Sequence, residues 1–259
     1  MIYKRKLMYI DSKGIIFRRT KTTDMRSMLL IFTEKYGKLS VGTNLAGKNK
    51  KRGSLALRPF TCGNYQIYKG RNYYNLDRVE TVRSFYGIGE DPDKYMAASL
   101  ALELAEKTVP EEVPQQKIFS LLLEFLSEIE TRKQRYLTLL LAFEAKLLSL
   151  LGMFPVLDSC ACCSKAEDLS HFSVEEGGLI CRDCFERCGK TGHERLIFKL
   201  NFDIVNVLNY FITNPLKTFE NIALKEEVEE ELQKIMRSYI SFHMDVGKLK
   251  SDKMLSDKL

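Results

Sequence analysis

Four cysteines in two pairs constrain the fold of this chain more than any other feature. The pattern is Cys160-x2-Cys163-x17-Cys181-x2-Cys184. Two CxxC pairs at this separation are typical of a site in which four thiolates converge tetrahedrally on one zinc ion. Four thiolates fill the coordination shell and leave no position for water or substrate. The pattern therefore predicts one structural zinc ion, Zn2+, and no catalytic metal.

Neighbouring residues leave some freedom in the ligand set. Cys162 and Cys188 are extra thiols beside the motif, and either could replace one of the four ligands without loss of the metal. His171 and His193 flank the motif, and we expect them at the surface because four better-spaced thiolates are available. The pair Gly177-Gly178 suits a hairpin turn before the second CxxC. Disulfides are the alternative, but cysteine-dense secreted domains are usually short.

Neither secretion nor membrane insertion is indicated. Lys4-Arg5-Lys6 resembles the start of a signal peptide, but the apolar run Leu7 to Ile10 is shorter than the roughly seven to fifteen residues required. The most apolar stretch, Leu137 to Leu151, falls short of the roughly twenty residues of a membrane span and contains charged residues. It predicts a buried helix at the centre of a bundle. We expect a bacterial-type cytoplasmic protein with no membrane partner.

Charge is distributed unevenly along the chain. The whole chain carries a net charge of +6, but residues 1–83 contain 19 Lys and Arg against five acids, a surplus of 14. The remaining residues must therefore carry a net charge of −8. This asymmetry predicts that the first third binds a polyanion and that the rest is a mildly acidic scaffold.

The first third, residues 1–83, shows apolar residues at alternate positions in short runs separated by turn residues. Five or six short strands in about eighty residues favour a small closed barrel, and an oligonucleotide-binding (OB) Greek-key barrel fits that size. An SH3-like barrel fits the pattern nearly as well. The expected strands are Leu7–Arg18, Met25–Thr33, Lys38–Leu45, Ser54–Thr61, Tyr65–Lys69 and Tyr73–Asp77.

Cations and aromatic residues of this third are candidates for nucleic-acid binding. The segment between Gly47 and Gly53 is the most basic, which suits contact with phosphates. Exposed aromatic rings could stack on bases, although barrel aromatics are more often in the core, so we expect one or two contacts. The candidate phosphate ligands are Lys48, Lys50, Lys51, Arg52, Arg58, Arg18 and Arg19, and the candidate rings are Tyr65, Tyr68, Tyr73 and Tyr74.

The pattern becomes helical near residue 90, where Asp91 suits a helix cap and Pro92 a first helical position. The fold class is therefore α+β: an N-terminal all-β OB-type barrel, then an α-helical domain with an inserted four-cysteine zinc finger. We place the helical domain at 90–155 and 190–247, the zinc finger at 156–189 and a flexible tail at 248–259. The expected helices are 92–107, 114–132, 134–152, 202–213 and 225–246.

The order of these parts and two local stretches resemble the RecO family. The stretches are Ala46-Gly-Lys-Asn-Lys-Lys-Arg-Gly-Ser-Leu-Ala-Leu-Arg-Pro-Phe60 and Phe143-Glu-Ala-Lys-Leu-Leu-Ser-Leu-Leu-Gly-Met-Phe-Pro155, and the second runs directly into the first CxxC. The resemblance covers nearly the whole chain. It departs from the family at Thr22-Thr23-Asp24-Met25, which lacks the Gly-Glu pair of many relatives, and at Cys162.

The resemblance implies a protein that is not an enzyme and that has no small-molecule substrate. It implies binding of single- and double-stranded DNA, annealing of complementary strands, and loading of recombinase together with RecR and single-strand-binding protein, on nucleoid DNA. The acidic tail of single-strand-binding protein would suit a pocket with a cationic rim. Arg132, Lys133 and Arg135 are the candidates for that rim, although a solvated helix junction is the simpler explanation of this cluster.

Two other classes of function compete with this one. A zinc-dependent hydrolase or deaminase requires an open metal position, and the His-x-Glu and Pro-Cys-x-x-Cys pattern of the deaminases is absent from the sequence. A zinc-stabilised RNA-binding or transcription-associated protein is compatible with the basic barrel. A preference for strand annealing over RNA binding would separate it from the DNA-repair interpretation.

Overall fold

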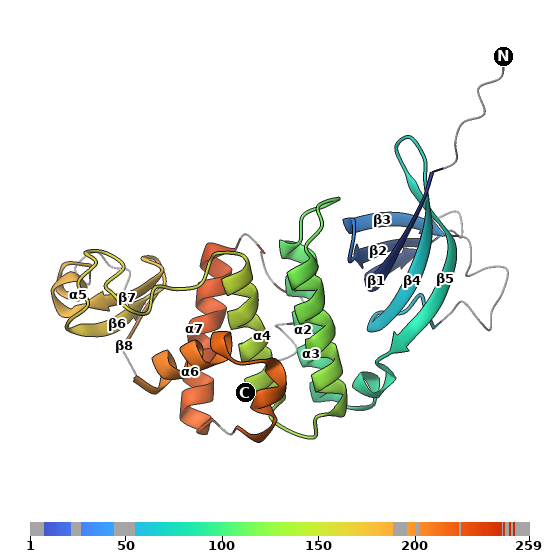
Figure 1. Cartoon of the computed structure of the whole chain (residues 1–259). Coiled ribbons are helices and arrows are strands. Elements are labelled where there is room, and N and C mark those ends of the chain that lie inside the picture. Colours follow the sequence, from blue (N-terminus) through green and yellow to red (C-terminus); the bar gives the residue numbers. More distant parts are fainter. Residues whose placement is uncertain are drawn as a thin grey trace, which may run out of the picture. The chain divides into compact units, whose positions relative to one another are not determined.

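The computed structural model describes residues 8–21, 27–43, 55–188, 196–199, 202–222 and 224–244, and the single positions 246, 249 and 251. The chain divides into two compact units, Met1–Thr131 and Arg132–Leu259, which are described separately (Figure 1). Nearly all of the expected tail, 248–259, and the basic segment between Gly47 and Gly53 lie outside the described residues.

The first unit begins with a closed barrel of five described strands, which confirms the OB-type barrel. Its strand order is β1-β2-β3-β5-β4, and β1 also pairs with β4 to close the barrel (Figure 1). All the strand pairs are antiparallel except β3 with β5. The strands are β1 (Met8–Lys21), β2 (Ser27–Thr33), β3 (Gly37–Thr43), β4 (Thr61–Lys69) and β5 (Tyr74–Ser84).

Alternation of apolar residues explains why these segments form strands around one core. Along β3 every second side chain is buried, as the period-two pattern predicts. Tyr65 of β4 is also buried, and its hydroxyl donates a hydrogen bond to the backbone carbonyl of Ala56 at 3.0 Å. The barrel core contains Ile10, Ile16, Leu29, Ile31, Leu39, Val41, Leu57, Tyr65, Ile67 and Leu76.

The expected strand Ser54–Thr61 is wrong. Residues 55–60 form turns, and β4 runs without a break from Thr61, so it also includes the expected strand Tyr65–Lys69. The reason lies in the local sequence, because Ala56 and Leu57 are adjacent yet both are buried, which a strand with one buried face does not allow. Pro59 also has no N–H group for a strand ladder.

The barrel is followed in the same unit by η1 (Tyr86–Glu90), α2 (Pro92–Thr108) and α3 (Gln116–Thr131). The predicted start of α2 is confirmed, since the Asp91 carboxylate accepts hydrogen bonds from the N–H groups of Asp93 and Lys94 at 2.8 and 3.2 Å. This cap satisfies N–H groups that have no partner within the helix.

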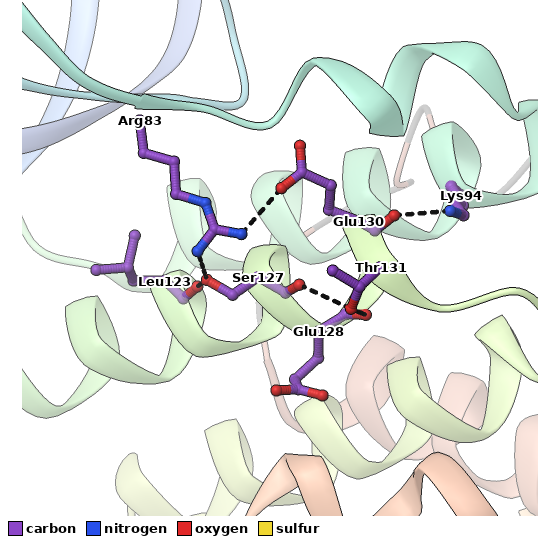
Figure 2. A network of polar contacts seen from close by, with 7 residues as sticks. All are labelled: Arg83, Lys94, Leu123, Ser127, Glu128, Glu130 and Thr131. Carbon is purple, nitrogen blue, oxygen red and sulfur yellow. Dashed lines mark hydrogen bonds and ion pairs between the residues drawn. The ribbon is translucent and has the colours of Figure 1, made fainter.

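Polar contacts join the last strand of the barrel to α3, which explains why the helices belong to the first unit. The Arg83 guanidinium donates to the Ser127 hydroxyl at 3.1 Å and contacts the Glu130 carboxylate at 2.9 Å, as Figure 2 shows. Lys94 of α2 donates to the backbone carbonyl of Glu130 at 2.8 Å. The division between the two compact units falls after Thr131, and the domain boundary predicted between residues 83 and 90 stays a prediction.

The second unit is built on α4, which is buried along most of its length. This helix covers the apolar stretch that the sequence analysis expected at the centre of a bundle, and it contacts α6, α7 and η4. One face of α7 is buried from Val228 to Ile240. The helical elements are α4 (Tyr136–Leu150), α6 (Phe202–Thr213), η4 (Leu216–Asn221) and α7 (Glu226–His243).

A small three-stranded sheet and a short helix lie between α4 and α6 in the chain. The strand order is β7-β6-β8, and α5 follows β7 directly. These elements are β6 (Leu169–Ser173), β7 (Gly178–Cys181), α5 (Arg182–Cys188) and β8 (Ile197–Lys199), and they carry the cysteine motif. Within the described ranges, no helix combines the length and the apolar character needed to cross a bilayer.

We predict that Arg83→Ala lowers the free energy of unfolding by about 1 kcal/mol, because it removes a half-exposed ion pair and a hydrogen bond to α3. Urea unfolding followed by circular dichroism measures the change. Arg78→Ala is the matched control, since Arg78 is an exposed arginine of the same strand. An equal loss in both variants would contradict a specific role of Arg83.

Candidate metal centre and nucleic-acid interface

The four motif cysteines converge on one point. The Sγ atoms of Cys160, Cys163, Cys181 and Cys184 all lie within 4.8 Å of one another, and those of Cys163 and Cys181 are 3.7 Å apart. Thiolates at about 2.3 Å from a tetrahedral ion are about 3.8 Å from one another. The cysteine cluster can therefore hold a metal ion in the arrangement that the spacing predicted.

Tight local turns bring the sulfur atoms together. In the first CxxC, the N–H of Cys160 donates to the carbonyl of Lys165 at 2.7 Å, and the N–H of Ser164 donates to the carbonyl of Cys160 at 2.8 Å. Ser164 adopts a left-handed backbone with φ of 62° to close this turn. In the second CxxC, Cys181 ends β7 and Cys184 lies in the first turn of α5.

N–H donors around the cluster favour thiolates. The backbone N–H of Cys181 donates to Sγ of Cys160 at 3.4 Å, and the Arg187 guanidinium donates to Sγ of Cys184 at 2.9 Å. Burial alone raises the pKa of the Cys160 thiol, but backbone N–H groups of Cys181 and of the first CxxC outweigh it and lower that pKa to about 6. Burial raises the pKa of Cys184, and Arg187 opposes this effect.

Of the additional thiols and histidines beside the motif, the side chains of Cys162 and His171 are described, and neither belongs to the four-sulfur cluster. Cys162 is exposed and lies outside the four-sulfur group, while the side chain of Cys188 and all of His193 lie outside the described residues. His171 is half buried rather than at the surface, because its ring stacks on Phe185 at a centroid distance of 3.6 Å. Burial and then the charge of Lys199 lower the pKa of His171.

A close backbone approach joins the start of the finger to its β6–β7 hairpin. The N–H of Val156 donates to the carbonyl of Gly177 at 3.0 Å, and the N–H of Leu179 donates to the carbonyl of Val156 at 2.8 Å. A Cβ at Gly178 would lie 2.3 Å from that Val156 carbonyl oxygen, so residue 178 must be glycine. Gly177 has φ of +79° in the turn between β6 and β7, which confirms the predicted hairpin.

Side chains of α7 complete the anchor. Nε2 of His243 lies 2.6 Å from the carbonyl oxygen of Val174, and the Tyr239 hydroxyl donates to the carbonyl of Met153 at 3.1 Å. The ring of Tyr239 also packs edge-on against Phe172 of β6. The finger is therefore held against α7 by contacts of His243 and Tyr239 with Val174 and Phe172, and none of these contacts uses a cysteine ligand.

The candidate phosphate ligands are only partly described. Arg58 is exposed in the turn that follows the basic segment. Arg18 forms an ion pair with Glu106 of α2 at 2.8 Å, and Arg19 donates to the Ser27 hydroxyl at 3.2 Å and 3.0 Å. The side chains of Arg18 and Arg19 therefore form contacts within the first unit. Lys48, Lys50, Lys51 and Arg52 lie outside the described residues.

The three residues proposed to form a cationic rim for an acidic tail differ in their exposure to solvent. Arg132 is only 4% exposed and donates from Nη1 to the backbone carbonyl of Phe219 at 3.2 Å, so its guanidinium does not form part of a rim that faces solvent. Lys133 is exposed. Arg135 has a left-handed backbone with φ of 62° immediately before α4, and its side chain is half buried.

The candidate rings separate into core and surface. Tyr65 is 1% exposed, so the expectation that it could stack on a base is wrong. Tyr74 is half buried against the barrel core. Tyr68 and Tyr73 lie at the surface and form ring contacts with each other, and Tyr68 also contacts Tyr9, which the sequence analysis did not single out. The alternation of apolar residues along β1 could have placed Tyr9 on the outer face of the barrel. Its contact with Tyr68 depends on the register between β1 and β4.

Comparison with known proteins identifies the family. The family model described as recombination protein O N terminal matches residues 8–85, and the one described as recombination protein O C terminal matches residues 89–253. A DNA repair protein RecO of Caldanaerobacter subterraneus subsp. tengcongensis is 31% identical over 93% of this chain and 95% of that protein. Those of Alkaliphilus metalliredigens and Listeria innocua are 30% and 29% identical, over 92% and 95% of this chain and 95% and 93% of their own lengths. The resemblance seen in the sequence is thus confirmed, and the chain belongs to the RecO family of DNA repair proteins.

Proposed function

We propose that this protein binds single- and double-stranded DNA, anneals complementary strands, and acts with RecR and single-strand-binding protein to load recombinase in recombinational repair. The observation that carries the proposal is the coincidence of an OB-type barrel with the basic third of a RecO-family chain. OB barrels commonly bind oligonucleotides across one face and its adjoining loops. A surplus of 14 positive charges in residues 1–83 supplies the attraction that such a surface needs.

Annealing follows from charge neutralisation rather than from acid–base chemistry. Two strands repel each other through their phosphates, so cations that bind both strands lower the barrier to their encounter. The basic segment offers Lys48, Lys50, Lys51 and Arg52, and Arg58 lies exposed just after it. No group has to take up or release a proton, which supports a protein that is not an enzyme.

The metal ion proposed for the cysteine cluster is a single zinc with a structural role. Four thiol donors and their tetrahedral spacing suit zinc, and all four positions of the shell are taken by protein. Bound there, the ion would compensate the charge of buried thiolates and hold the two CxxC turns to each other. It would thereby fix the finger that the chain inserts between α4 and α6.

Partner binding is proposed for the second unit. An acidic protein tail would be attracted by Lys133 and Arg135, which lie at the junction before α4. Arg132 would contribute through the backbone that it holds at Phe219 rather than by direct contact. RecR is the second proposed protein partner. The alternative function, RNA binding or association with transcription, is supported by the basic barrel alone.

We predict that combined replacement of Lys50, Lys51 and Arg52 by alanine weakens binding to all DNA sequences and slows annealing. The slope of log affinity against log salt for single strands should fall by about 0.7 for each lost phosphate contact, or about 2 in total. Fluorescence anisotropy of a labelled oligonucleotide at several salt concentrations measures it.

The matched control replaces three exposed lysines outside the basic segment, Lys117, Lys217 and Lys234, with alanine. This control has the same change in net charge and should keep most of the salt slope. An unchanged salt slope in the variant of the basic segment would contradict the assignment of that segment to phosphate binding. Tight RNA binding without annealing by the unaltered protein would favour the alternative function.

We predict one zinc ion per chain in purified protein. Cys160→Ser and Cys184→Ser should each abolish it and lower the stability of the finger by at least about 3 kcal/mol, because structural zinc contributes on the order of 10 kcal/mol to folding of small fingers. Metal analysis and thermal unfolding measure both effects. Cys162→Ser is the control that should retain the metal, since Cys162 lies outside the cluster. Retention of zinc by Cys160→Ser would show that another ligand takes its place.

A further inference from the structure

Three tyrosines form a continuous row on the outer surface of the barrel. The rings of Tyr9 and Tyr68 have centroids 5.8 Å apart, and those of Tyr68 and Tyr73 have centroids 6.0 Å apart. They come from β1, from β4 and from the turn between β4 and β5. Tyr9 is 45% and Tyr73 is 53% exposed, and Tyr68 between them is half buried. The aromatic row is thus an exposed surface with its rings already in contact.

The backbone fixes the position of the rings. Tyr9 lies directly opposite Tyr68 in the antiparallel pair of β1 and β4, so the register of barrel closure sets their contact. At the turn, the N–H of Gly70 donates to the carbonyl of Tyr73 at 2.9 Å. The Tyr73 ring folds over Gly70, where a Cβ would lie 2.4 Å from Cζ of that ring. Rings that are already positioned lose little conformational freedom when a ligand binds.

Charge around the aromatic row favours a polyanion. Residues 65–76 contain Lys69 and Arg71, both exposed, and no acid. The nearest acid along β1 on the same face is Asp11, which is exposed and pairs with Gln66, on the side away from the turn. Lys69 and Arg71 therefore lie where the row meets the turn, and Asp11 lies beyond its other end. The acids that oppose these cations are the exposed Asp77 of β5 and Glu112, whose charge acts on Lys69.

We infer that Tyr9, Tyr68 and Tyr73 form a stacking platform for the unpaired bases of single-stranded nucleic acid, with Lys69 and Arg71 beside the phosphates. This inference deepens the proposed function and rests on it. Exposed rings bind bases of any sequence, since every base has a π-face. Bases of a duplex are stacked on one another and cannot reach such rings. The platform therefore adds affinity for single strands and adds none for duplex DNA.

Replacement of the rings tests whether they add affinity for single strands and none for duplex DNA. Tyr68→Ala and Tyr73→Ala should each weaken binding of oligothymidylate by roughly five- to 150-fold and leave binding of a duplex of equal length within about twofold. Tyr73→Phe should retain the affinity, because phenylalanine stacks as well. Tyr86→Ala is the matched control, since Tyr86 is an exposed tyrosine of the same unit, in η1, outside the aromatic row. Circular dichroism checks that each variant is folded.

A spectroscopic test reports contact directly, because the chain contains no tryptophan. Tyr73→Trp introduces one tryptophan into the aromatic row, and its emission should be quenched when oligothymidylate binds. The Tyr86→Trp variant, with its tryptophan outside the row, should show little quenching at equal saturation. Equal quenching in both variants, or no quenching in either, would overturn the platform.

The remaining outcomes separate the inference from the proposed function. Failure of the unaltered protein to bind any DNA would overturn the proposed function. Normal binding by that protein, with unchanged single-strand affinity in Tyr68→Ala and Tyr73→Ala, would overturn the platform alone. Equal losses for single strands and duplex would also overturn it. Unchanged DNA affinity with loss of stimulation by single-strand-binding protein would assign the row to protein docking instead.

Discussion

Pairing of β1 with two partners is the constraint on which the first unit depends. The N-terminal half of this strand pairs with β4 and its C-terminal half pairs with β2, and the two pairings overlap at Gly14 and Ile15. This double use closes the sheet, buries one apolar core and leaves no free edge on β1. The same register places Tyr9 opposite Tyr68. Stability and the exposed aromatic row thus have one origin.

The finger depends on the cysteine cluster as the first unit depends on the pairing of β1, but the physical reason differs. The core cluster described around the metal site contains Ile180 and three of the cysteines, with Leu169, Phe185 and Ile197 packed partly against it. Phe172, Val174 and Leu179 of the finger are buried as well. So small a core buries too little apolar surface to offset the entropy of ordering the chain. A metal ion bound by the four thiolates would supply what such a core lacks. The contacts of His243 and Tyr239 would then need only to orient a finger that the bound ion holds together.

Some features could be read from the sequence because they depend on local patterns. The ligand spacing predicted the four-sulfur cluster, Asp91-Pro92 predicted the start of α2, and the alternation of apolar residues predicted most of the barrel. Other features depend on tertiary contacts. The segment 55–60 is apolar like a strand but packs as turns, and Arg83 reaches α3 through a side chain whose target lies more than forty residues away. Burial of Arg132 likewise follows from packing that its neighbours in sequence do not reveal, whereas Tyr65 alternates with the buried Ile67 along β4.

The two kinds of candidate contact on the first unit have different physical consequences. Cations of the basic segment act on phosphates, which single strands and duplexes share, so they give affinity that depends on salt and distinguishes the two forms weakly. Rings act on bases, which only a single strand exposes. They therefore give a preference for single-stranded over duplex DNA that depends little on salt. A protein that anneals strands has to bind two single strands and then release a duplex. A surface that loses its ring contacts as bases pair would favour that release, while the cations would still hold the product briefly.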